Sequence, residues 1–187
     1  MNKSIIITVI LLISSLPGSF SQTVNIGLTS DVILTFINNP ENKIRGTYIS
    51  IPPFNAYLKA GIQYGIFGID LKGGLLLGSP YFGGEYGANL KIKTTEKISA
   101  LIAWLRHVNG SGEVTLVGNY DEPINFIGFG AETKFTKLFG IDFILYFPVG
   151  NNKLRFIRSM NDPAILFVRS RVGPAVRLSF IFDIIRT

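Results

Sequence analysis

Apolar and polar residues alternate along most of this chain after residue 22. The clearest segments are 24–36, 54–66, 86–94, 127–135 and 172–184. Successive side chains of a β-strand point to opposite faces, so this two-residue period predicts strands with one apolar and one polar face. Three less regular segments are read as strands from their neighbours: 69–78, 98–107 and 141–149.

The seven connections between these eight strands alternate in length. The long ones are 37–53, 79–85, 108–123 and 150–171, and the short ones lie near 67–69, 95–97 and 137–140. Long loops at one end and tight turns at the other are typical of a transmembrane up-and-down β-barrel. We therefore predict an all-β fold, a transmembrane eight-stranded antiparallel barrel with a packed polar lumen.

The tetrapeptide Phe-Gly-Ile-Asp occurs twice, at 67–70 and at 139–142. Both copies fall at short connections, where glycine permits the positive φ of a tight hairpin. The phenylalanine of each copy is expected at the membrane interface, and the aspartate is expected to point to the lumen or its rim. We interpret the repeat as the same hairpin-turn sequence occurring at two short connections.

The first 21 residues have the three-part plan of a cleaved secretory signal peptide. Lys3 is followed by an apolar stretch from Ile5 to Leu16, and small residues precede Gln22. The stretch is shorter than the roughly 20 residues that span a bilayer; a membrane anchor or a buried first strand is the alternative. The expected domains are a signal peptide at 1–21 and a barrel at 22–187.

Composition narrows the class of protein further. The chain is 47% hydrophobic, yet it has no apolar run of 18 residues after residue 22, so its apolar residues are spread over alternate positions as in a membrane barrel. It contains no cysteine, which removes disulfides and thiolate chemistry. The net charge of +6 comes from scattered basic residues, so we expect no nucleic-acid partner.

The chain resembles the small eight-stranded outer-membrane barrels of the OmpA/OmpX transmembrane type. The last strand, "AVRLSFIFDIIRT", is similar to the C-terminal signal that the barrel assembly machinery reads, through Val176, Leu178, Phe180 and Phe182. It departs from that pattern by running on to Arg186 and Thr187 instead of ending on an aromatic residue. A signal peptide ending before Gln22 also resembles those of exported proteins of Bacteroidota. The resemblance implies the outer membrane of a Gram-negative cell.

One face of the predicted strands carries charges of both signs, which pair well in a lumen. We expect a lumen network of Lys59, Gln63, Asn89, Lys91, Glu132, Lys134 and Arg177. Glycines of the same face would leave room for these side chains: Gly61, Gly65, Gly87, Gly128 and Gly130. The rival fold is a soluble barrel of the lipocalin type, which is apolar inside and polar outside.

No residue set predicts catalysis or a cofactor. His107 is the single histidine, and Ser111 and Glu113 follow it in a loop, so a serine nucleophile is conceivable only in principle. A histidine near a strand end is usually solvated or interfacial, and we interpret His107 in that way. One histidine without cysteine cannot build a transition-metal site, so neither a metal nor another cofactor is expected.

The connection at 150–171 is long, basic and partly apolar. Its basic residues are Lys153, Arg155, Arg158, Arg169 and Arg171. The segment is read first as an extension of the flanking strands, and alternatively as a contact for a partner or for lipopolysaccharide phosphates.

The expected function is that of a non-enzymatic, structural or interaction barrel, an accessory subunit of a larger outer-membrane complex. A narrow porin-like channel and a lipid A-modifying enzyme are the alternatives. The expected partners are outer-membrane lipid and lipopolysaccharide, other outer-membrane proteins, and the barrel assembly machinery during insertion.

Overall fold

The structure is a computed structural model that describes residues 22–38, 47–50, 54–77, 83–109, 123–157 and 167–186. The predicted signal peptide lies outside these residues. Ten strands form in the described part of the chain: β1 (Gln22–Asn38), β2 (Thr47–Ser50), β3 (Phe54–Tyr64), β4 (Phe67–Leu77), β5 (Gly83–Lys93), β6 (Ile98–Asn109), β7 (Ile124–Lys134), β8 (Phe139–Val149), β9 (Lys153–Ile157) and β10 (Phe167–Arg186).

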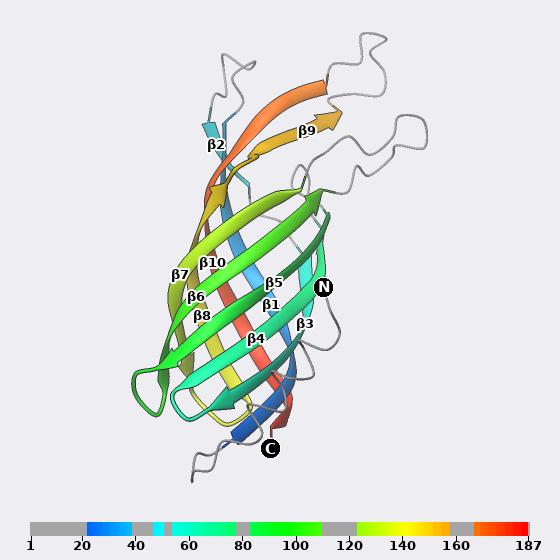
Figure 1. The fold of residues 1–187 in the computed structure, drawn as a ribbon. Helices are drawn as coiled ribbons and strands as arrows, with labels where there is room; N and C mark the ends of the chain where they lie inside the picture. The colour runs from blue at the N-terminus through cyan, green and yellow to red at the C-terminus, as the bar shows by residue number, and fades with distance from the viewer. Residues whose placement is uncertain are drawn as a thin grey trace, which may run out of the picture.

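Eight of these strands close into one antiparallel barrel (Figure 1). The order around the wall is β1, β3, β4, β5, β6, β7, β8 and β10, and β10 then pairs with β1. Consecutive barrel strands are neighbours in the wall, which is up-and-down connectivity. The predicted eight-stranded up-and-down barrel is confirmed.

Three tight turns join strands at one end of the barrel, which we call the turn end: 65–66, 94–97 and 135–138. The first and third lie slightly before the predicted positions 67–69 and 137–140. In the first turn Gly65 has a φ of 58°, in the left-handed region that glycine favours. The prediction that Gly65 belongs to the lumen is therefore wrong, because it is the turn residue.

Both Phe-Gly-Ile-Asp copies begin a strand directly after a turn, β4 in one case and β8 in the other. The prediction that their glycines form the turns was wrong, since Gly68 and Gly140 pair within the sheet. The aspartates of the two copies, Asp70 and Asp142, are buried inside the barrel as predicted. The repeat therefore restarts the inside–outside alternation after each turn.

At the opposite end, which we call the loop end, β1 and β10 continue past the barrel wall (Figure 1). β2 pairs with residues 35–38 of β1, and β9 pairs with residues 167–171 of β10, which makes a four-stranded extension, β2-β1-β10-β9. These strands lie within the predicted connections 37–53 and 150–171. For its described residues, the interpretation of the last connection as a strand extension is confirmed.

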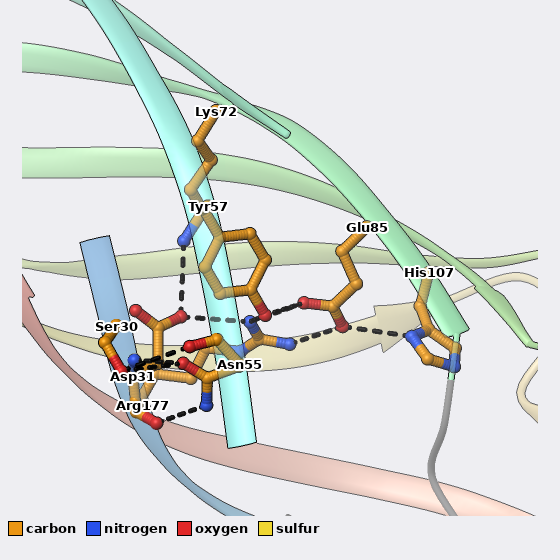
Figure 2. Close-up of polar contacts among 8 residues, drawn as sticks. All are labelled: Ser30, Asp31, Asn55, Tyr57, Lys72, Glu85, His107 and Arg177. Atoms are coloured by element: carbon orange, nitrogen blue, oxygen red, sulfur yellow. Dashed lines mark hydrogen bonds and ion pairs between the residues drawn. The ribbon is translucent and has the colours of Figure 1, made fainter. Parts of the chain in front are cut away.

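The extension meets the barrel wall at two breaks in the sheet, and an asparagine lies at or beside each break. Beside the break between β2 and β3, the side chain of Asn55, the second residue of β3, pairs with both backbone groups of Asp31: its Nδ2 donates to Asp31 O, and Asp31 N donates to its Oδ1 (Figure 2). Between β8 and β9, Asn152 Nδ2 donates to Val172 O at 3.3 Å, and Val172 N donates to Asn152 O at 2.8 Å. Asparagine thus replaces ladder hydrogen bonds that the breaks remove.

The outer wall of the barrel is apolar on every strand. Exposed examples, one from each strand, are Leu28, Leu58, Leu71, Leu90, Ile102, Phe129, Phe143 and Phe182. Such a surface suggests a membrane barrel, because a soluble barrel is polar outside. No helix in the described part of the chain is long and apolar enough to cross a bilayer.

The barrel interior contains an apolar cluster, most of which comes from β6, β7 and β8. Three inward residues of β6, Leu101, Ala103 and Leu105, belong to a buried cluster with Phe126 on β7 and Ile144 on β8. This explains why segment 98–107 is apolar on both faces: one face joins the cluster and the other forms the outer wall. The remaining wall, from β10 through β1 to β5, supplies most of the charged interior residues.

Candidate functional site

Most of the interior charges form two connected groups. The first, which we call the upper network, includes residues near the loop ends of β5 and β6 (Figure 2). Arg177 on β10 reaches across the lumen to Glu85 on β5 through two hydrogen bonds, of 2.7 Å from Nη1 and 2.6 Å from Nη2. Tyr57 on β3 donates its hydroxyl to Glu85 Oε2 at 2.7 Å. Arg177 Nη1 also donates to Asp31 Oδ2 at 3.3 Å. Bidentate, buried pairs of this kind are the stronger hydrogen bonds of proteins.

Lys72 on β4 is a second buried cation of the upper network and pairs with the carboxylate of Asp31. Its Nζ lies 3.9 Å from Asp31 Oδ2. The same ammonium lies 5.4 Å from the ring centre of Tyr57 and 5.8 Å from that of Tyr146. These distances are within the range of cation–π attraction, so aromatic faces help to hold the buried lysine.

His107 belongs to the upper network. It is fully buried, with 0% exposure, and its Nδ1 lies 3.0 Å from Glu85 Oε1. The interpretation of His107 as a solvated or interfacial residue is therefore wrong. It stands at an inward position of β6, so alternation turns it into the lumen. Ser111 and Glu113, its hypothetical catalytic partners, lie outside the described residues.

The second group, which we call the lower network, lies toward the turn end. Lys91 on β5 forms ion pairs with Asp70 at 2.6 Å and with Glu132 on β7 at 2.5 Å. Lys59 on β3 forms ion pairs with the same two carboxylates, at 2.9 and 3.5 Å. Each of these carboxylates faces at least two ammonium groups, which offsets the cost of burying the charges.

The lower network continues to the last strand. Lys134 lies 3.7 Å from Glu132 and 2.7 Å from Asp183 on β10. Asn25 on β1 donates to Asp183 Oδ1 at 3.4 Å. The network therefore links β3, β4, β5, β7, β10 and β1 near the turn end. A small polar recess opens there, lined by Thr23, Asn25, Gln63, Asp70, Lys91, Glu132, Lys134 and Asp183.

The seven residues predicted for the lumen all come from inward positions. The buried ones are Lys59, Asn89, Lys91, Glu132 and Arg177. Gln63 and Lys134 are half-buried near the turn end. Arg177 belongs to the upper network, whereas the predicted lysines and Glu132 belong to the lower one, so the sequence set falls into two groups.

Six network residues were not singled out from the sequence: Asn25, Asp31, Tyr57, Lys72, Glu85 and Asp183. Glu85 was assigned to the connection 79–85, which was wrong, because β5 begins at Gly83. Gly83, Gly84 and Gly87 lie around Glu85. Because glycine has no side chain, the alternation of apolar and polar residues cannot be read there. The other five stand at inward positions of the alternating pattern, which could have identified them.

Four of the five basic residues predicted to contact a partner or lipopolysaccharide lie on β9 and β10 at the loop end. Lys153 and Arg171 are exposed and stand opposite each other in the β9–β10 pair. Arg155 and Arg169 form another opposing pair in the same ladder. Arg158 lies outside the described residues. The extension therefore places four basic residues on two adjacent strands.

No known protein family matches this chain, and no curated protein matches its sequence.

Proposed function

We propose that this protein is a closed, non-enzymatic outer-membrane barrel that acts as a structural or interaction protein, an accessory subunit of a larger outer-membrane complex. The observation that carries the proposal is the filled interior. Two salt-bridged networks and an apolar cluster occupy the lumen of an eight-stranded barrel. Eight strands leave room for side chains and little else.

A closed interior directs function to the outside of the molecule. The wall offers an apolar surface that hydrocarbon chains would solvate. The β2-β1-β10-β9 extension stands clear of the barrel and has two edge strands, β2 and β9. Edge strands have backbone groups available to pair with another chain, which supports a protein partner at the loop end.

Conductance in planar bilayers tests the closed lumen. We expect the full mature chain to give no stepwise conductance. Arg177→Ala removes the cross-lumen hydrogen bonds and should produce openings, whereas Lys97→Ala, at an exposed turn outside the lumen, should produce none. Steady conductance by the unmodified chain, altered by Lys59→Ala or Glu132→Ala, would instead establish the narrow channel.

Purification of a tagged copy from native membranes in mild detergent tests the interaction role. We expect other outer-membrane proteins to co-purify in fixed stoichiometry and to be lost when residues 153–171 are replaced by a short glycine–serine linker. A monomer that purifies alone would contradict the role of subunit. Altered lipid A mass on deletion of the gene would favour the lipid-modifying alternative.

A further inference from the structure

Arg106 on β6 is the exception to the apolar outer wall. Among the described residues of the eight barrel strands, it is the single charged side chain at an outward position between the turn end and the loop end. It is half-buried, and its Nε is buried without a hydrogen-bond partner. No described residue forms an ion pair with it, so its charge faces outward with nothing in the described barrel to neutralise it.

The neighbours of Arg106 indicate its level in the wall. Its partners across the sheet are Tyr86 on β5 and Asn125 on β7, and Trp104 precedes it on the same face. Tyr86 and Trp104 pack edge to face with ring centres 5.9 Å apart, and they are 46% and 40% exposed. Tryptophan and tyrosine gather where the hydrocarbon of a bilayer meets its headgroups.

An arginine on the lipid-facing side of a barrel is costly at the middle of the bilayer and nearly free at the interface. Arg106 lies near the loop end of β6, three residues before the strand ends at Asn109. Its guanidinium offers donors in a planar fork that matches two oxygens of a phosphate. The amide of Asn125 stands beside it as a further donor.

We propose that Arg106, with Asn125 and the Tyr86–Trp104 pair, forms a binding site on the outer wall for the phosphate headgroup of an anionic lipid. The arginine and the amide hold the phosphate, and the aromatic rings contact the first carbons of the acyl chains. The site rests on the proposed membrane function, because a lipid reaches this wall only in a bilayer. It is separate from the basic residues of the β9–β10 extension.

The test uses the full mature chain in nanodiscs of phosphatidylcholine with a minor share of phosphatidylglycerol. Lipids that stay bound after release into the gas phase are counted by native mass spectrometry. We expect retention of phosphatidylglycerol over phosphatidylcholine, and we expect Arg106→Gln to weaken that preference at least about tenfold. Arg106→Lys keeps the positive charge but lacks the planar guanidinium, so its preference for phosphatidylglycerol should lie between those of the parent and Arg106→Gln. Lys97→Gln is the matched control at an exposed turn.

Equal retention of phosphatidylglycerol by the Arg106→Gln variant and the parent would overturn the site. Displacement of the lipid by millimolar inorganic phosphate would also overturn it, because the anion and not the lipid would then be the ligand. Failure of the parent chain to enter nanodiscs is a different result, since it would contradict the membrane function itself.

Discussion

At the scale of single residues, Arg177 is the side chain on which the upper network depends. It is 1% exposed, and it donates to Glu85, Asp31 and the hydroxyl of Tyr57. Removing one partner of a buried pair leaves the other charge uncompensated, which costs about 3–5 kcal/mol. We expect Arg177→Met to lower the free energy of unfolding by that amount, measured by urea titration in phospholipid vesicles with the fluorescence of Trp104, the single tryptophan.

Two further variants separate loss of the pair from loss of the side chain. Glu85→Met combined with Arg177→Met removes both charges, so the double variant should recover a large part of the lost stability. Lys97→Met changes a lysine at an exposed turn and should stay within about 0.5 kcal/mol of the parent. An Arg177→Met variant as stable as the Lys97→Met control would show that the network contributes nothing to stability.

Gly65 provides a second prediction at this scale. With φ at 58°, a side chain there meets the steric cost of the left-handed region, roughly 1–2 kcal/mol. Gly65→Ala should therefore destabilise the barrel by about 1 kcal/mol in the same urea titration. Gly84→Ala is the matched control, because an added Cβ at Gly84 meets no atom within 4 Å. Equal stability of the two variants would contradict the role of Gly65 in the turn.

At the scale of elements, alternation predicted the barrel strands well because both faces have strict requirements. The outward face must be apolar along its length, and the inward face is filled by paired charges or by the apolar cluster. Prediction failed at Glu85, because the neighbouring glycines have no side chains and the apolar–polar alternation cannot be read there. It also could not pair Arg177 with Glu85, 92 residues away, because the stagger of the closed barrel decides which residues meet across the lumen.

The breaks between barrel and extension were likewise invisible to alternation. Asn55 satisfies the backbone N–H and C=O of Asp31, which the interrupted ladder leaves open. An unsatisfied buried backbone group costs about 1–3 kcal/mol. We expect Asn55→Ala to lose about 1–3 kcal/mol and to speed hydrogen exchange at the amide of Asp31, measured by NMR in micelles.

Ala56→Ser is a suitable control for this element, since Ala56 is the next residue of β3 and points outward. It should leave the exchange of the Asp31 amide unchanged. Slow exchange at Asp31 in the Asn55→Ala variant would mean that another group protects this amide, and the break would then not depend on asparagine.

At the scale of the whole molecule, the question is whether lipid or water covers the outer wall. Most barrel strands have 11 residues, close to the 9–11 that a tilted strand needs to cross a bilayer. Leu71 stands at the middle of β4 and Leu138 at a turn, with similar exposures of 57% and 53%. In water, arginine at either position would be tolerated equally.

In a bilayer the two positions differ, because the cost of a lipid-facing arginine depends on depth. Leu71→Arg should lower the free energy of unfolding by about 2–4 kcal/mol, and Leu138→Arg by about 0–1 kcal/mol. Urea titration in phospholipid vesicles measures both values. Similar values for the two variants would place the wall in water and favour the soluble barrel. A clear difference would require hydrocarbon around the middle of the strands, and the closed lumen would then leave only the wall and the two rims for function.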